Sequence, residues 1–303
     1  MDISVIIVNY NTRDITKQCL DSIYKWTKDV MFEVIVVDNN SNDGSKEMLE
    51  SYPNIKYIQS GANLGFGKAN NLGYQHSSGK YILLLNSDTY LLNNALKAFV
   101  DEFDLLPKTI GCIGGWLRSP DGSLNNSYSY IPNLKSSFLS ILGIYLRLFG
   151  RKPKINEVQE YITNSKEVEY VIGADICIRR KVIEHCGLFD PDFFMYYEDT
   201  EMQLRYKKAG YKFMIVPSPL IVHLECMSSK DVNKKYTYKN RKMFFNSYLL
   251  FMKKRCTRLE YILFRIVFIF QFPIFLAPYY SLKEKFKMIS LLFKPSVKDI
   301  RRL

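Results

Sequence analysis

The chain has 303 residues, a hydrophobic content of 47% and a formal net charge of +12. This length accommodates one large core, or one domain with an appendage, and the hydrophobic content is ordinary for a globular protein. The charge is unevenly divided, since residues 1–225 contain 24 Lys and Arg against 26 Asp and Glu, whereas residues 226–303 contain 18 against 4. Because these basic residues lie beside an apolar run and not on a DNA-reading helix, we expect no nucleic-acid partner.

The six cysteines are scattered through the chain without C-x-x-C spacing. This pattern predicts no zinc site, and we expect reduced, mostly buried thiols, as in a cytoplasmic protein. The first residues, 1–8, have the apolar pattern of a strand and lack the cationic start and cleavage site of a signal peptide.

The N-terminal third alternates apolar runs with helical patterns. Strands are predicted at residues 3–8, 33–37, 55–59 and 81–85, with helices at 14–26, after residue 45 and after the glycine-rich stretch 63–73. Strands that alternate with helices over about 90 residues predict an α/β fold with a mostly parallel, doubly wound sheet and helices on both faces.

Polar residues follow three of these strands directly, namely Asn9, Asp38 and Asp88. The carboxyl ends of parallel strands share one edge of a sheet, so we expect these side chains to lie on one rim, where open α/β sheets bind ligands. Taken alone, Asp88 is equally well explained as the N-cap of a helix.

The residues after the first strand indicate which ligand this rim binds. A dinucleotide fold would show G-x-G-x-x-G there, but the chain reads Asn9-Tyr10-Asn11. Tyr10 is placed to stack on a nucleotide base, with a packing role as the alternative, and Asp38 is placed to accept from a base N–H. Asp88 is placed to hold a cation against a diphosphate, because hard cations bind carboxylate and phosphate oxygens together. These residues favour a nucleotide diphosphate with a metal over NAD.

The middle of the chain contains a predicted strand and hairpin at residues 110–135 and an apolar helix at 136–149. The helix ends in a basic cluster and is interpreted either as a lid or as a surface-seeking insertion. Residues 155–167 are predicted to form a polar loop.

A second dense region begins near residue 168. It contains a strand at 171–180 with a glycine, Gly173, that lets another group approach the backbone closely. Glu198 and Asp199 open a helix predicted at 200–209, where the helix dipole favours carboxylates, so a capping role is the alternative to a catalytic one. His223 ends the second of two strands predicted at 212–216 and 220–223.

Several motifs occur in the order typical of one enzyme family. They are Val-Asn-Tyr-Asn, Val-Val-Asp-Asn-Asn-Ser-Asn-Asp-Gly-Ser, Asn-Leu-Gly-Phe-Gly-Lys-Ala-Asn-Asn, Leu-Leu-Asn-Ser-Asp, Gly-Ala-Asp, Phe-Phe-Met-Tyr-Tyr-Glu-Asp-Thr-Glu and His-Leu-Glu-Cys-Met-Ser. Over residues 1–230 the chain resembles family 2 glycosyltransferases, and within them the rhamnosyltransferase-type branch that builds bacterial surface polysaccharides.

The resemblance implies a GT-A fold and inverting transfer of a sugar, with rhamnose as one candidate, from a nucleotide-diphosphate sugar. The acceptor that we expect is a polyprenyl-linked glycan, because a lipid-linked acceptor would account for the basic and apolar C-terminal part of the chain. The resemblance also implies that Asp199 is the general base and that Asp88 and His223 lie at a divalent cation, Mg²⁺ or Mn²⁺. The remaining predicted donor-binding residues are Asn9, Tyr10, Asn11, Asp38, Asn63, Gly65, Lys68, Asn86 and Ser87. Those predicted for the acceptor and sugar pocket are Trp116, Gly173, Ala174, Asp175, Tyr197 and Glu198. A non-catalytic nucleotide-sugar-binding partner of a membrane polysaccharide assembly complex is the alternative.

Three positions depart from the family pattern. Asn86 stands where the first Asp of D-x-D is common, so the metal keeps fewer charged ligands. Cys226 stands where a glycine is common after the histidine. The Q-x-x-R-W motif of processive synthases is absent, which favours the addition of one sugar or a few.

The C-terminal quarter predicts a membrane-associated tail. A basic helical segment at 234–256 precedes an apolar run at 261–280, which Arg265 and two prolines interrupt. We expect this run to lie in or dip into one leaflet, with a span and a helix packed on the catalytic core as alternatives. The predicted division is therefore a catalytic domain at 1–230, with halves meeting near residue 115, and a tail at 231–303. We expect the protein to bind an anionic membrane surface, the cytoplasmic face of a bacterial inner or plasma membrane.

Overall fold

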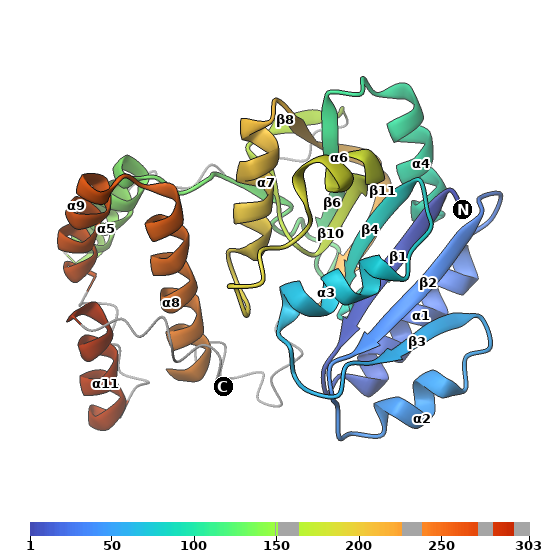
Figure 1. Cartoon of the computed structure of the whole chain (residues 1–303), viewed down its shortest axis with the longest axis horizontal. Coiled ribbons are helices and arrows are strands. Elements are labelled where there is room, and N and C mark those ends of the chain that lie inside the picture. Colours follow the sequence, from blue (N-terminus) through green and yellow to red (C-terminus); the bar gives the residue numbers. More distant parts are fainter. Residues whose placement is uncertain (149, 151–163, 226–237, 272–280, 294–303) are drawn as a thin grey trace. The chain divides into compact units, whose positions relative to one another are not determined.

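The predicted strands form one mixed sheet in the computed structural model, which describes residues 1–148, 150, 164–225, 238–271 and 281–293 (Figure 1). Within these residues eight strands follow the order β3-β2-β1-β4-β10-β6-β11-β5, and β8 pairs with β11. A separate two-stranded sheet joins β7 to β9. The strands are β1 (Ile3–Asn9), β2 (Phe32–Asp38), β3 (Ile55–Gln59), β4 (Tyr81–Asn86), β5 (Thr89–Leu91), β6 (Ile110–Arg118), β7 (Tyr128–Ser129), β8 (Lys166–Val168), β9 (Tyr170–Val171), β10 (Asp175–Arg179) and β11 (Lys212–His223).

The helices include those predicted between the strands. They are α1 (Arg13–Trp26), α2 (Ser45–Glu50), α3 (Phe66–Gln75), α4 (Ala95–Leu105), α5 (Leu134–Leu148), α6 (Arg180–Cys186), α7 (Glu198–Lys208), α8 (Tyr238–Arg255), α9 (Arg258–Ile269) and α11 (Leu282–Phe293). Among the described helices, none is long and apolar enough to cross a bilayer.

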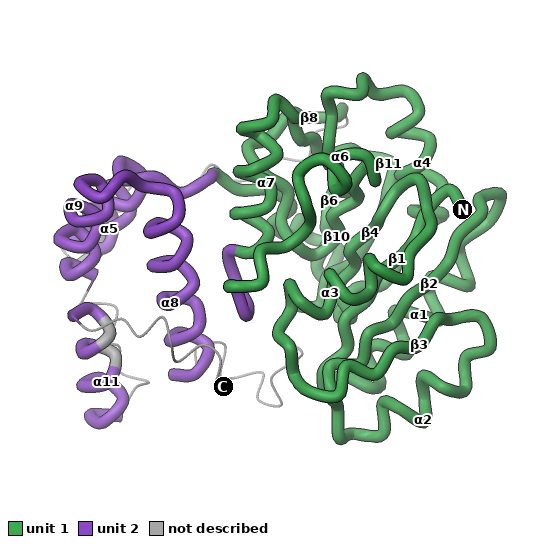
Figure 2. The backbone as a smooth tube through the Cα atoms, viewed as in Figure 1, with its two compact units in different colours: residues 1–130, 159–192, 198–235 green, residues 131–158, 193–197, 236–303 purple. Residues whose placement is uncertain are grey.

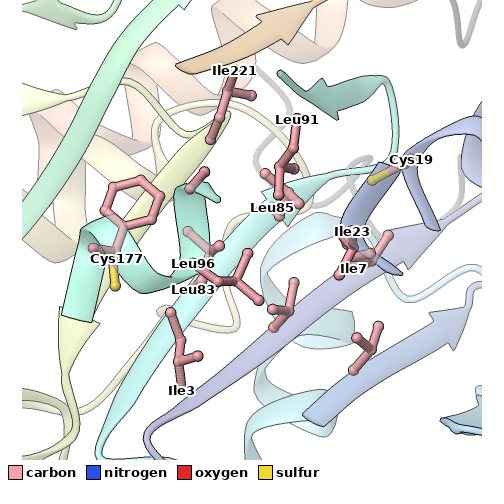
Figure 3. Close-up of a cluster of buried hydrophobic side chains, with 14 of the residues drawn as sticks. Ile3, Ile7, Cys19, Ile23, Leu83, Leu85, Leu91, Leu96, Cys177 and Ile221 are labelled. Carbon is pink, nitrogen blue, oxygen red and sulfur yellow. The ribbon is translucent and has the colours of Figure 1, made fainter. Parts of the chain in front are cut away.

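Successive side chains of a strand point to opposite faces of the sheet, and helices cover both faces. On β4, Leu83 and Leu85 enter one hydrophobic cluster with residues of α1, α2 and α4, part of which Figure 3 shows. Ile82 and Leu84, one residue out of phase, enter the other cluster with residues of α3, α6 and α7. Strands covered on both faces must be apolar throughout, which explains the unbroken runs in the sequence.

Two strands differ from the predicted arrangement. β10 is antiparallel to both of its neighbours, β4 and β6, so the parallel order is interrupted in the middle of the sheet. The two strands predicted at 212–216 and 220–223 are one strand, β11, whose register with β6 shifts between Val216 and Leu220. The two prolines there lack an N–H, and they fall between the segments of β11 that pair with β8 and with β5.

The chain forms two compact units (Figure 2). The first unit contains residues 1–130, 159–192 and 198–235, and the second contains residues 131–158, 193–197 and 236–303. This division differs from the predicted one, because α5 and the aromatic segment 193–197 group with the C-terminal helices. The basic cluster after α5, most of the loop predicted at 155–167, Cys226 and residues 272–280 of the apolar run lie outside the described residues.

Candidate active site

The polar residues that end β1, β2 and β4 lie side by side, as predicted for Asn9 and Asp38, and Asp88 follows two residues after the end of β4. Asn9 pairs in register with Asp38, and Val8 pairs with Asn86 on the other side of β1. Parallel pairing brings these strand ends to one edge, so they form a rim of the first unit (Figure 1).

Asp38 is the centre of a hydrogen-bond network on this rim. Its carboxylate is fully buried and accepts from the Asn9 amide at 2.7 Å and from the N–H and hydroxyl of Ser41. The Asn9 side-chain oxygen in turn accepts from the hydroxyls of Thr12 and Thr16. The network fixes the loops after β1 and β2, and a contact between Asp38 and a base remains a prediction.

Tyr10 is held outward by the same loops. Its side chain is 43% exposed, and the next residue, Asn11, has a left-handed backbone with φ 54°. The Asn11 N–H donates to the Ser41 hydroxyl, and its side-chain oxygen accepts from the Asn42 N–H. Tyr10 therefore presents its ring at the rim, as stacking on a base requires, whereas Asn11 orders the loop.

The loop between β3 and α3 meets the rim through Asn39. The Asn39 amide donates to the side-chain oxygen of Asn63, which also accepts from the N–H of Gly65, the N-cap residue of α3. Lys68 lies in the first turn of α3 and is half-buried. A cation in the first turn of a helix is disfavoured by the helix dipole, so an anionic partner would stabilise it there.

Asp88 and His223 meet although 134 residues separate them in the sequence. The Asp88 Oδ1 lies 3.3 Å from the His223 Nε2, and both side chains are largely buried. Pairing of Thr89 with His223 and a hydrogen bond from the Leu224 N–H to the Asp88 carbonyl oxygen fix this arrangement. Ser87, one residue earlier, contacts Thr12 through hydroxyls 3.3 Å apart.

Asp199 stands at the start of α7 and is bound by two backbone N–H groups. Its Oδ1 accepts from Thr200 at 2.7 Å, and its Oδ2 accepts from Gly173 at 3.1 Å. The predicted close approach at Gly173 is confirmed, because a Cβ built there would lie 3.1 Å from the Asp199 Oδ2. The neighbouring Ala174 carbonyl oxygen accepts from the Asn86 N–H, so one stretch of backbone links Asp199 to the Asn86-Ser87-Asp88 turn.

Glu198 and Asp199 are neighbouring carboxyl groups, and burial raises the pKa of both. Glu198 is buried, its Oε2 has no hydrogen-bond partner, and burial together with the nearby Asp199 raises the pKa of Glu198 to about 8. Burial also raises the pKa of Asp199, while the donors on Thr200 and Gly173 oppose that rise. The donors on Asp199 favour its charged form, whereas the Glu198 Oε2 has no such donor, so Asp199 is the carboxyl group of the pair better suited to accept a proton.

This burial predicts a specific pH dependence of stability. Below about pH 4.5, the pKa of Glu198 in the unfolded protein, the folded and unfolded proteins both bind its proton. The contribution of the protonated side chain to the free energy of unfolding is then lost as the pH rises through its folded pKa of about 8. We expect Glu198→Gln, which keeps a neutral side chain of similar shape, to gain at least about 1 kcal/mol over the wild type between pH 5 and pH 9. Thermal unfolding across that range measures the difference. Glu184→Gln, at an exposed position on α6, should show no such change, and parallel curves for Glu198→Gln would contradict the assignment.

Three residues predicted for the sugar pocket lie behind the site. Trp116 has no exposed surface and packs edge-on against Tyr128, so it is a core residue and its prediction as a sugar contact is wrong. Ala174 and Asp175 are also buried. Asp175 accepts from the Gly115 N–H at 2.7 Å, and burial raises the pKa of this carboxyl well above its ordinary value.

Tyr197 belongs to the second unit, unlike Glu198, which follows it in the sequence. Its ring stacks on Tyr248 with centroids 5.1 Å apart. Thr12, Ser41 and Asn39, which order the rim, were not selected from the sequence. All three lie in the polar stretches that follow β1 and β2, and this position in the sequence could have identified them as residues of the rim.

Comparison with known proteins identifies the family of the chain. The family model described as "Glycosyl transferase family 2" matches residues 4–187. The chain is 29% identical over 211 residues to the N-acetylglucosaminyl-diphospho-decaprenol L-rhamnosyltransferase of Mycobacterium tuberculosis (strain CDC 1551 / Oshkosh), covering 65% of this chain and 67% of that protein. It is 26% identical over 227 residues to the rhamnosyltransferase WbbL of Escherichia coli (strain K12), covering 72% and 82%.

Solved structures share the fold. GalNAc-T7 with UDP, GalNAc and Mn²⁺ aligns with a TM-score of 0.63 at 18% identity, over 100% of this chain and 57% of that one. The mannosyltransferase PcManGT from Pyrobaculum calidifontis, in complex with GDP-Man and Mn²⁺, aligns with a TM-score of 0.55 at 16% identity, over 99% and 82%. The predicted GT-A fold and the rhamnosyltransferase-like resemblance are thus confirmed, and the chain belongs to glycosyl transferase family 2.

Proposed function

We propose that this glycosyltransferase moves a sugar from a nucleotide-diphosphate sugar to a hydroxyl of a lipid-linked glycan, with inversion at the anomeric carbon. The observation that carries the proposal is the backbone link from Asp199 through Gly173 and Ala174 to the Asn86-Ser87-Asp88 turn. It holds a carboxylate able to take a proton next to the turn at which the predicted diphosphate site lies.

Asp199 would act as the general base. A carboxylate has about four lone-pair positions. Two backbone N–H groups and the Thr200 hydroxyl donate to Asp199, which leaves a position for an acceptor hydroxyl. Removal of that proton while the donor bond breaks on the opposite side accounts for inversion in one step. General-base catalysis of this kind contributes about 10²–10⁴-fold to the rate.

Asp88 and His223 would hold the divalent cation. Their 3.3 Å separation lets one cation contact both side chains, and carboxylate with imidazole is a donor set that Mg²⁺ or Mn²⁺ accepts, with imidazole mildly favouring Mn²⁺. Among the described residues no group of three or more His, Cys, Asp and Glu side chains is available, so the diphosphate would supply further ligands. When bound, the cation offsets negative charge on the departing diphosphate.

The donor and acceptor are assigned by position and by the relatives. We place the base at Tyr10 and the diphosphate near Lys68 and Asn86, with Asn9, Asn11, Asp38, Asn63, Gly65 and Ser87 shaping the site. Two relatives are named as rhamnosyltransferases, and the name of one includes a diphospho-decaprenol glycan, which supports rhamnose and a polyprenyl-linked acceptor. Such an acceptor would place the reaction at a bacterial membrane, and we expect its cytoplasmic face.

A donor screen tests the function. The protein is incubated with dTDP-, UDP- and GDP-sugars, a divalent cation and a polyprenyl-diphosphate-linked N-acetylglucosamine. Release of nucleoside diphosphate and the mass of the lipid product are measured, and NMR of the product gives the anomeric configuration. We expect one donor class to transfer with inversion. Tight binding of a donor without transfer or hydrolysis would instead indicate a non-catalytic binding partner.

Gly173→Ala tests the positioning of the base. The added methyl group would meet the Asp199 Oδ2 at 3.1 Å and force the carboxylate to move by a few tenths of an ångström. Because a 1 Å misplacement costs about 10²-fold, we expect kcat to fall about three- to tenfold. The matched control is Gly111→Ala at the start of β6, where the new Cβ meets Tyr211 at 3.0 Å. Equal losses of kcat in both variants would show a general packing effect and contradict the proposed role.

A further inference from the structure

One face of α9 exposes an apolar stripe on the second unit. Leu259, Ile262, Leu263 and Ile266 recur at helical spacing, Phe270 continues the series beyond the helix end, and all five side chains are 43–67% exposed. Residues three, four and seven positions apart lie on one side of a helix. The stripe is therefore a continuous surface and not a scatter of single exposed residues.

The opposite side of α9 is already packed. Phe264 and Phe268 have no exposed surface, and both contact the Tyr248 ring of α8 edge-on. A helix that is apolar on two opposite sides requires a second apolar environment besides its own core. The stripe thus remains unburied after the second unit has folded.

The neighbouring helix α5 also exposes apolar residues. It packs beside α9, and its inner face is anchored by the hydroxyls of Ser137 and Tyr248, 2.5 Å apart (Figure 2). Its outer residues Phe138, Leu139 and Leu142 are 44–54% exposed. The apolar helix predicted as either a lid or a surface-seeking insertion is thereby grouped with the C-terminal helices.

The helix α11 repeats the pattern with flanking cations. Leu282, Phe286 and Phe293 recur at intervals of four and seven residues and are 62–75% exposed. Lys283 and Lys287 are also exposed and lie on one flank of this stripe. A hydrogen bond from the Arg265 guanidinium to the Leu292 carbonyl oxygen joins α11 to α9.

The charge around these helices is strongly positive. The described part of the second unit contains thirteen Lys and Arg against two acidic residues, Glu260 and Glu284. Both glutamates serve as helix caps, since Glu260 accepts from Thr257 and Glu284 accepts from Ser281. An apolar stripe flanked by exposed lysines is the pattern of helices that lie in a membrane interface.

We propose that the exposed faces of α5, α9 and α11 form a docking surface for an anionic lipid bilayer. The apolar side chains would enter the boundary between head groups and acyl chains, and the cations would contact the anionic head groups. A second copy of this chain fits less well, because two surfaces with this excess of positive charge would repel each other. The lipid surface rests on the proposed function in one respect, since a lipid-linked acceptor would lie in such a bilayer. Binding of the protein to the bilayer does not require the catalytic residues.

Vesicle flotation with the full chain tests the surface. The probes are vesicles of phosphatidylcholine alone and vesicles in which about one lipid in three is phosphatidylglycerol. We expect the wild type to bind the mixed vesicles more strongly, and Ile262→Gln with Ile266→Gln to bind them at least about tenfold more weakly. The control is Met31→Gln with Leu105→Gln, at two exposed apolar positions of the first unit, which should bind as the wild type does.

Three outcomes decide the proposal. Equal binding by the stripe variant and the control variant would overturn it, as would a wild type that binds neither vesicle. A wild-type dimer that dissociates in the stripe variant, without vesicle binding, would assign the surface to a second copy. Asp199→Asn is expected to float like the wild type. A wild-type protein that binds the mixed vesicles but transfers no sugar in the donor screen would defeat the proposed function and leave the surface assignment standing.

Discussion

Asp199→Asn is expected to lower kcat by about 10²–10⁴-fold while the affinity for the nucleotide-sugar donor stays unchanged. The amide is nearly the same size as the carboxylate but cannot take a proton from the acceptor hydroxyl. We place the nucleotide of the donor at the rim formed by β1, β2 and β4, where its proposed contacts do not include the Asp199 carboxylate, so donor affinity should not depend on the charge of Asp199. Initial rates of nucleoside diphosphate release and a donor-binding titration measure the two effects separately.

The structure also predicts a cost in stability for this variant. Gly173 and Thr200 both donate N–H groups to the Asp199 carboxylate, and an amide can accept on only one side, so one donor would face another donor. An unsatisfied buried donor costs about 1–3 kcal/mol, and the unfolding curve therefore has to be recorded beside the rate. Asp192→Asn, at an exposed position in the loop before α7, controls for the loss of a carboxylate. A folded Asp199→Asn protein that turns over at the wild-type rate would show that another group is the base.

The rim of the site was predictable because it depends only on where the buried parallel strands end in the sequence. Unbroken apolar runs predict strands buried on both faces, and parallel strands bring the residues that follow them to one edge. Asn9, Asp38 and Asn86 lie next to one another for that reason. No contact between distant parts of the chain had to be known.

The pairing of Asp88 with His223 needed information that the sequence pattern does not contain. Both residues were selected, but their contact depends on β5, a strand of three residues that pairs with the end of β11. So short a strand has no recognisable period. The antiparallel direction of β10 was missed for a similar reason, because residue types in a buried strand do not report its direction.

Aromatic residues were the least predictable part of the site. Trp116 follows two glycines in β6 and could have lined a sugar pocket, but β6 is buried on both faces, so the indole packs in the core. Tyr197 precedes Glu198 directly, yet a left-handed backbone with φ 65° lies at that point, and its ring packs on α8. Large apolar side chains gain most of their stabilisation from burial, and whether they gain it in a core or against a ligand depends on tertiary packing.

The second large effect that we expect comes from removing Asp88, one of the two side chains proposed to bind the metal. Asp88→Asn keeps the shape of the turn but replaces a charged oxygen ligand by a neutral one, and Asn86 beside it is already neutral. Loss of a supporting contact at a metal site costs about 10–100-fold in affinity, so loss of the one carboxylate paired with His223 should weaken Mn²⁺ binding by at least that factor. Electron paramagnetic resonance of free Mn²⁺, titrated with protein and nucleoside diphosphate, measures the affinity without requiring turnover.

His223→Gln distinguishes a metal site from a simple ion pair. If Asp88 and His223 hold one cation, either substitution should weaken Mn²⁺ binding, and a chelator should stop turnover of the wild type. If the two side chains only pair with each other, removal of the imidazole would leave Mn²⁺ binding unchanged and turnover would survive the chelator. Asp14→Asn, at an exposed carboxylate in the first turn of α1, controls for the loss of one negative charge from the first unit. Asp88 directly precedes β5, and β5 pairs with the end of β11 at Thr89 and His223. Unfolding curves should therefore reveal any loss of that pairing before a change in affinity is assigned to the metal.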